Sequence, residues 1–111
     1  MTEPLPAAQL QACNDYFGGN HELFLNYSRL CRQQFPHDVA AADQAWQAGD
    51  AATLHRIAHN LKTVLQTLGC PDLSDQAREL EQTCASAGLT PAAHALWQAL
   101  RPTLLQWPAS D

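Results

Sequence analysis

The 111-residue chain lacks features that mark several classes of protein. Lys62 is its only lysine, and its arginines are scattered, so no clustered basic surface for nucleic acid is expected at a formal net charge of −5. No run approaches the roughly 18 apolar residues of a membrane span, and the amino terminus lacks the basic and apolar regions of a secretion signal. We therefore expect a cytoplasmic protein that binds neither nucleic acid nor a membrane.

The chain also lacks closely spaced cysteines. No C-x-x-C motif is present, and most of the cysteines fall at apolar positions of helical patterns. We expect buried free thiols in a reducing compartment. These residues are Cys13, Cys31, Cys70 and Cys84.

Residues that favour strands are scarce as well, whereas Ala, Leu and Gln are abundant, so the composition favours helices. The length suits one domain, residues 1–111, with a single hydrophobic core. Short connections between amphipathic helices indicate antiparallel neighbours. The predicted fold is all-α, an antiparallel up-down four-helix bundle with an additional short N-terminal helix.

Glycines divide the chain into five predicted helical segments, the first spanning residues 7–17. The second opens at the cap Asn20 and is either one helix kinked at Pro36 or two helices in line. The others are residues 51–68 after the cap Asp50, a segment starting near Pro71, and one that opens at Thr90-Pro91 and bends at Pro102. Trp46, Trp97 and Trp107 are expected at helix ends or core edges. The side chains predicted to face inward are Leu23, Phe24, Tyr27, Leu30, Cys31, Phe35, Val39, Ala42, Trp46, Leu54, Ile57, Ala58, Leu61, Val64, Leu65, Leu68, Leu73, Ala77, Leu80, Cys84, Ala87, Leu96, Leu100, Leu104 and Trp107.

His59 is the most informative residue, because it points away from the apolar stripe of its predicted helix. Each helical residue rotates by about 100°, which places His59 roughly opposite that stripe. A solvent-facing imidazole beside cations suits an anionic adduct, and neutral imidazole is a usable nucleophile near pH 7. The polar, locally cationic strip around it comprises His55, Arg56, Lys62, Thr63 and Gln66.

An ordered set of motifs surrounds His59. It resembles the histidine phosphotransfer (HPt) family, whose helical domains carry phosphate between receiver domains in two-component phosphorelays. A-H-x-L-K alone is weak evidence, but the ordered set over roughly sixty residues is fairly specific. The motifs are Gly18-Gly19-Asn20, Glu22-Leu23, Phe35-Pro36, Gly49-Asp50, Leu54, Ala58-His59-Asn60-Leu61-Lys62, Leu68-Gly69 and Leu80-Glu81.

The resemblance implies a role for each motif residue. His59 would accept a phosphoryl group from a receiver-domain aspartate and pass it to another receiver. Lys62 would hold the phosphoryl oxygens, and Glu81 on the adjacent helix would orient the imidazole. The chain would be a monomeric phosphocarrier rather than an enzyme, with no cofactor of its own.

The resemblance also implies the partners, which are response-regulator receiver domains or a hybrid sensor histidine kinase. The receiver would supply the aspartate and Mg²⁺. No glycine-rich phosphate loop is present, so ATP binding is not expected. Met1 and the full set of helices favour a free-standing protein over a domain of a hybrid kinase. The residues assigned to partner binding are His55, Arg56, Thr63 and Gln66.

One residue departs from the family pattern. Thr63 stands where the family usually has glycine, one turn from His59 on the exposed face, so it would narrow partner choice or slow transfer. Thr63 therefore keeps open a second hypothesis, a non-catalytic HPt-like module that docks a kinase or response regulator without carrying phosphate. A weaker third hypothesis is a metal site at His55 and His59, which have two-histidine spacing.

Overall fold

The computed structural model describes residues 5–106, and this part of the chain is helical without any strand. The all-α prediction is confirmed. None of the described helices is both long and apolar enough to cross a membrane. The helices are α1 (Ala7–Phe17), α2 (His21–Ala48), α3 (Ala51–Thr67), α4 (Pro71–Ala87) and α5 (Pro91–Leu105).

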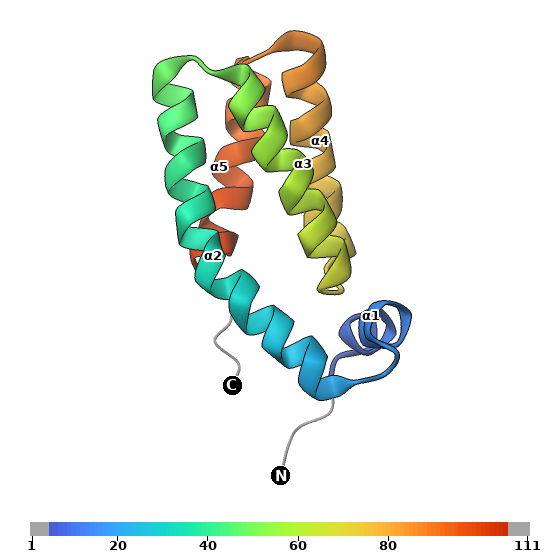
Figure 1. The fold of residues 1–111 in the computed structure, drawn as a ribbon. Coiled ribbons are helices and arrows are strands. Elements are labelled where there is room, and N and C mark those ends of the chain that lie inside the picture. The colour runs from blue at the N-terminus through green and yellow to red at the C-terminus, as the bar shows by residue number, and fades with distance from the viewer. Residues whose placement is uncertain (1–4, 107–111) are drawn as a thin grey trace.

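Helices α2 to α5 enclose the main core. Figure 1 shows them running alternately up and down, with α1 at the end where α2 begins. α2 contacts α3 and α5, and α4 contacts the same two helices, so the four close around a shared interior. α1 contacts α2 and α3.

Side-chain caps fix where three of these helices begin. Asn20 accepts a hydrogen bond from the Leu23 N–H at 3.0 Å, and Asp50 accepts one from the Thr53 N–H at 3.0 Å. The Thr90 hydroxyl accepts from the backbone N–H of residue 93 at 3.1 Å. Each bond satisfies an N–H that has no partner within its helix. The three predicted caps are confirmed.

Helix α2 continues through Pro36, so the single-helix alternative is the correct one. Figure 1 shows α2 changing direction between its two halves. Proline removes one backbone donor and its ring crowds the preceding turn, which accounts for a bend. Pro36 itself is exposed, while Phe35 and Val39 continue the buried stripe on the other side.

The orientation of α3 is as predicted. Its buried side chains contribute to the main core, and Val64 packs at the edge of that core. These apolar positions lie three and four residues apart, which places them on one face of the helix. The buried residues between Ala51 and Leu68 are Leu54, Ile57, Ala58, Leu61, Leu65 and Leu68.

Three residues predicted to face inward are instead exposed. Leu23 and Leu30 lie in the first half of α2, where Leu30 is 63% exposed. Figure 1 shows the start of α2 extending past α3 and α5 towards α1, while Tyr27 and Cys31 in the same half still pack against the main core, so this half is covered only in part. Ala87 is exposed because it is the last residue of α4. The prediction for Trp107 falls outside the described residues.

Trp97 corrects a further prediction, because it lies in the core rather than at its edge, with 1% exposure. Its indole Nε1–H donates to Asp43 Oδ1 at 3.0 Å, so the buried ring keeps a polar partner. Arg101 on α5 binds both oxygens of Asp43, which ties α2 to α5. The Arg101 guanidinium holds the pKa of Asp43 below its ordinary value. Trp46 is half-buried at the edge of the core, as predicted.

The four cysteines are free thiols, as predicted. Cys13, Cys31 and Cys84 are buried, as predicted, whereas the predicted burial is wrong for Cys70, which is partly exposed in the connection before α4. Burial raises the pKa of the Cys31, Cys70 and Cys84 thiols. These thiols are therefore protonated at neutral pH.

Gly69, at the end of α3, allows the first turn of α1 to approach closely. Its φ is +79°, a region that side chains rarely adopt. A Cβ atom added there would lie 2.6 Å from the Ala8 carbonyl oxygen and 2.7 Å from the Gln9 Cα. The close approach of α1 to α3 thus requires a glycine at this position.

Gly69→Ala should destabilise the fold more than Gly49→Ala. Gly49 also has a positive φ, of +68°, but a Cβ there meets nothing within 4 Å. Both substitutions carry the left-handed cost of about 1–2 kcal/mol. Only Gly69→Ala adds a steric conflict, worth about 1–3 kcal/mol. Urea denaturation measures both losses, and equal losses would mean that α1 does not depend on this contact.

Candidate functional site

His59 stands on the exposed face of α3, with 54% of its side chain accessible to solvent. Its neighbours Ala58 and Leu61 are buried in the core. The helix therefore presents the imidazole outward while its opposite face is anchored. This placement agrees with the predicted helix orientation.

Glu81 on α4 joins the imidazole to the lysine one turn away. Its Oε2 lies 2.6 Å from His59 Nδ1, and its Oε1 accepts a hydrogen bond from Lys62 Nζ at 2.9 Å. An ionised carboxylate only accepts, so Nδ1 donates its N–H, and in the neutral imidazole this leaves the lone pair on Nε2. Nε2 is thus the ring nitrogen that does not bind Glu81.

The Glu81 carboxylate is well shielded, with 13% of its side chain exposed. The hydrogen bond from Lys62 is the main cause that lowers its pKa, and the His59 hydrogen bond adds to this effect. Partial burial acts in the opposite direction but does not prevail. Glu81 is therefore ionised at neutral pH, the state that accepts hydrogen bonds from both Lys62 and His59.

The sequence match agrees with this geometry. A search against protein-family models matches the Hpt domain over residues 26–107, which is more than half of the chain. The chain belongs to the Hpt domain family. Searches of curated proteins and of solved structures find no match. The resemblance drawn from the motifs around His59 is thereby confirmed, and α1 precedes the matched region of this Hpt domain.

Ser74 sets the register between the two helices of the Hpt site. It is buried, and its hydroxyl donates to the Lys62 carbonyl oxygen at 2.9 Å. Ser74 and Glu81 lie seven residues apart, so they share one face of α4. The sequence analysis missed Ser74. The available signal was its spacing from Ala77 and Glu81, which places it on the inward side of α4.

The structure brings His55 to the same carboxylate, because its Nε2 lies 3.8 Å from Glu81 Oε2. The Thr63 hydroxyl donates to the His59 carbonyl oxygen at 3.4 Å, within α3. Gln66 Nε2 donates to the Tyr16 hydroxyl at 3.3 Å, which connects the strip to α1. Arg56 is exposed and does not join these hydrogen bonds among the described residues.

The structure does not support a metal site at His55 and His59 in the described part of the chain. No group of three or more His, Cys, Asp and Glu side chains in residues 5–106 could hold a metal ion. The carboxylate nearest to His55 and His59 is already engaged by Lys62. Within residues 5–106, the two histidines are therefore not part of a group that could hold a metal ion.

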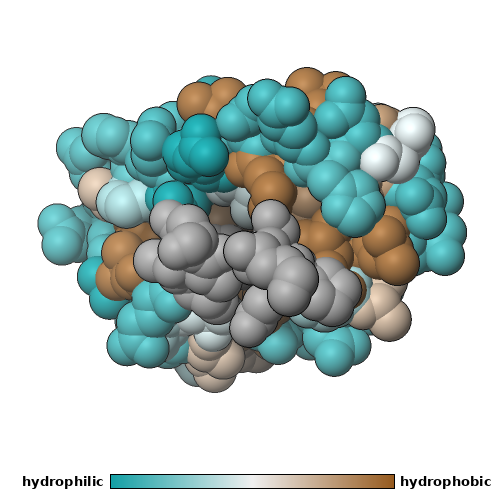
Figure 2. Space-filling model, turned by 90° about the horizontal axis from the view of Figure 1, so that it is seen from below, coloured by the Kyte–Doolittle hydropathy of each residue, from teal (hydrophilic) through white to brown (hydrophobic). Residues whose placement is uncertain are grey.

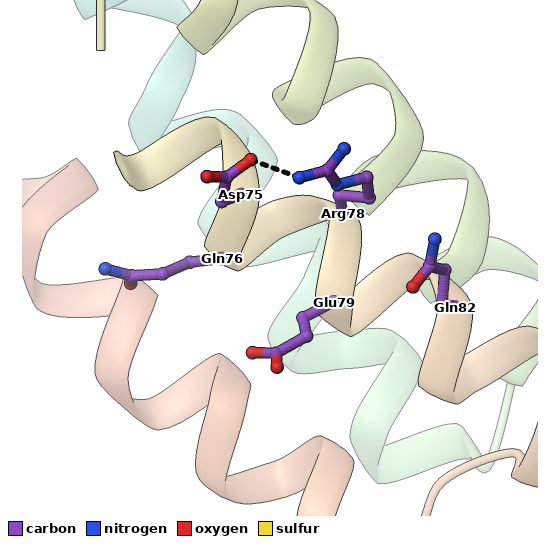
Figure 3. Close-up of a pocket in the computed structure, with 5 residues that line it drawn as sticks. All are labelled: Asp75, Gln76, Arg78, Glu79 and Gln82. Atoms are coloured by element: carbon purple, nitrogen blue, oxygen red, sulfur yellow. Dashed lines mark hydrogen bonds and ion pairs between the residues drawn. The ribbon is translucent and has the colours of Figure 1, made fainter. Parts of the chain in front are cut away.

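The lining of the hollow shown in Figure 3 includes neither His59 nor Lys62 nor Glu81. Its lining comes from α4 alone, and Arg78 and Asp75 form an ion pair across it. A depression along one helix has no opposing wall to enclose a ligand. We interpret it as the solvated face of α4. The lining residues are Asp75, Gln76, Arg78, Glu79 and Gln82.

Glu81→Gln should remove a pH-dependent part of the stability. Because the pKa of Glu81 is lowered by folding, its ionised form stabilises the fold above the ordinary glutamate pKa of about 4.3. This stabilisation is lost as the pH falls through the lower folded-state pKa. The difference in unfolding free energy between wild type and Glu81→Gln should therefore shrink from about pH 6 to about pH 2.

Urea denaturation across this range measures the difference. Glu79→Gln changes an exposed carboxylate on the same helix and is the matched control. A wild-type advantage over Glu81→Gln that does not change with pH would show that Glu81 acts through packing rather than charge.

Proposed function

We propose that this Hpt domain is a phosphocarrier in which His59 accepts a phosphoryl group from a receiver-domain aspartate and passes it to another receiver. The contact between Glu81 Oε2 and His59 Nδ1 is the observation that carries this proposal. It leaves Nε2 as the nucleophile of an imidazole that is half exposed. Family membership supports the same chemistry, because Hpt domains act in phosphorelays.

The proposed transfer is a single displacement at phosphorus. The Nε2 lone pair forms the P–N bond as the bond between phosphorus and the aspartate oxygen breaks, and the aspartate leaves as a carboxylate. The ring then carries a positive charge, which the adjacent Glu81 carboxylate stabilises through the Nδ1–H. A loose phosphoryl transition state needs mainly positioning and positive charge, which a rigid helical scaffold can provide.

Lys62 has a double role in this proposal. In the structure it donates to Glu81, and its side chain is 27% exposed. An ammonium group has three N–H donors, so Lys62 can keep this bond and still donate to a phosphoryl oxygen. Lys62 would thus hold both the orienting carboxylate and the incoming anion.

The remaining features of the proposal concern the whole chain. Residues 1–111 would form one monomeric cytoplasmic domain, an antiparallel up-down four-helix bundle with an additional short N-terminal helix. It would bind no cofactor itself and would act as a carrier rather than an enzyme. Receiver domains or a hybrid sensor kinase would be its partners, and the receiver would supply Mg²⁺ to neutralise phosphoryl charge.

Thr63 favours a second candidate function, a docking module that binds a receiver or kinase without carrying phosphate. The residue is exposed one turn from His59, where a partner must approach closely. Its hydroxyl is engaged with the His59 carbonyl oxygen. Its bulk therefore remains on the docking face, which the family usually keeps clear with glycine.

Phosphate should be found on His59. Incubation with a cognate phosphorylated receiver and Mg²⁺ should give an acid-labile, alkali-stable phosphate on this chain, because phosphohistidine has that stability. His59→Gln should abolish labelling. His55→Gln should only weaken labelling. The reason is that His55 lies 3.8 Å from the Glu81 carboxylate, too far for a hydrogen bond, whereas His59 lies 2.6 Å from it.

Radiolabel transfer and mass spectrometry provide the measurement. Labelling that persists in His59→Gln would assign the phosphate to another residue. Binding of a receiver without any labelling of wild type would instead establish the docking module.

Lys62→Ala should slow transfer by about one to two orders of magnitude. A charge-assisted hydrogen bond contributes about 1.5–3 kcal/mol, and each 1.36 kcal/mol changes a rate about tenfold. Lys62→Arg keeps the charge and should retain much more activity. Rapid-quench kinetics with one receiver compares the three proteins, and equal rates for wild type and Lys62→Ala would remove Lys62 from the site.

A further inference from the structure

Helix α1 lies outside the Hpt match but beside the helix that bears His59. It spans Ala7–Phe17, whereas the family match begins at residue 26. Figure 1 shows α1 at the end of α3 where α4 begins, and α1 contacts α3. The fold therefore adds an element of this chain to the neighbourhood of the site.

Several contacts of α1 do not involve its tyrosine. Ala12 and Cys13 are buried with Phe24 of α2, and the Phe17 and Phe24 rings meet edge to face with centroids 5.5 Å apart. Gly69 admits the first turn of α1. Tyr16 remains 50% exposed.

Tyr16 continues the strip of α3 that carries His59. Its hydroxyl accepts a hydrogen bond from Gln66 Nε2 at 3.3 Å. Gln66 lies seven residues after His59, which is two turns, about 10.5 Å along the axis and about 20° in rotation. A typical interface buries about 800 Å² per partner, which as a circular patch has a radius of about 16 Å. An interface centred on His59 would therefore reach Tyr16.

The exposed apolar side chains of the described residues are distributed unevenly. No exposed large apolar residue lies on α3 or α4, so the site itself is polar. Most of them lie on α1 and the first half of α2, and Figure 2 shows hydrophobic surface at that end of the molecule. Tyr16 is the one among them that hydrogen-bonds to the strip on α3. The full set is Leu10, Tyr16, Leu23, Leu25, Leu30 and Leu105.

We propose that Tyr16 is a specificity-determining residue, against which the receiver that docks over His59 packs an apolar surface. Exposed aromatic side chains with few rotamers are preferred at protein interfaces and often dominate their binding energy. The cationic strip would attract the acidic phosphorylation site of any receiver domain. Tyr16 would discriminate among receivers by the shape of the apolar surface that packs against it. The identity of the partner as a receiver rests on the proposed function.

The test measures receiver binding to the full chain and to three variants. Purified receiver domains, with Mg²⁺ present, are titrated into the ¹⁵N-labelled protein, and the receivers that bind are then used. Tyr16→Ala should raise Kd about fivefold or more, as truncation of an interface aromatic does. Tyr16→Phe keeps the ring and should stay within about twofold of wild type. Leu105→Ala, at a residue of 46% exposure on α5, is the matched control and should not change Kd.

Phosphoryl transfer gives an independent readout. Tyr16→Ala should raise KM for the receiver and leave kcat unchanged, because a contact about two turns from His59 contributes equally to ground and transition states. Circular dichroism melts should show that the variant folds like wild type, since the side chain is half exposed.

The outcomes separate this inference from the proposed function. Unchanged Kd and KM in Tyr16→Ala, with wild-type labelling of His59 intact, would overturn the role of Tyr16 alone. Weakened binding in Tyr16→Ala without any labelling of wild type would support the docking surface and overturn phosphate transfer. A wild-type chain that binds no receiver in the panel would overturn both.

Discussion

The Glu81 carboxylate, shared between Lys62 and His59, is the contact on which the site depends. A shielded carboxylate is costly unless a positive group or hydrogen bonds compensate it. Lys62 provides the charge at 2.9 Å, and the His59 N–H occupies the other oxygen at 2.6 Å. The same group therefore joins α3 to α4 and determines which nitrogen of the neutral imidazole carries the proton. A substitution of Glu81 would therefore change both the contact between α3 and α4 and the hydrogen bond to His59.

This contact works only if α3 and α4 keep their register. Rotation of α4 by one residue, about 100°, would carry Glu81 away from α3. Ser74 opposes such a slip because its buried hydroxyl binds the Lys62 carbonyl oxygen two turns from Glu81. Ser74 thus fixes the register of α3 and α4 more closely than apolar contacts alone, since a hydrogen bond tolerates a smaller range of distances and angles.

Much of the fold could be predicted from the sequence because its signals are local. The caps Asn20, Asp50 and Thr90 act on N–H groups three residues away, and the stripe of α3 follows from helical rotation alone. His59 could be found for the same reason. Its placement opposite that stripe needs no knowledge of neighbouring helices.

The remainder depends on which helix covers which face, and periodicity does not carry that information. Leu30 fits an inward spacing but is exposed, although Tyr27 and Cys31 beside it on α2 pack against the main core. The buried Trp97 donates its indole N–H to Asp43, which is 54 residues away in sequence. The bond between Tyr16 and Gln66 spans 50 residues and had no local signal. Such pairs become visible only when tertiary structure brings them together.

The separate packing of α1 has a consequence for dynamics. Ala12, Cys13 and Phe24 form a small cluster apart from the main core, and the long helix α2 takes part in both. Segments with few buried apolar contacts open at lower free energy than the global transition, in units that follow such boundaries. Amide protons of α1 should therefore exchange with solvent through a local opening that leaves the main core closed. Any ligand that holds α1 against α3 would suppress this opening, so the exchange rate of α1 reports occupancy of that surface without observing the ligand itself.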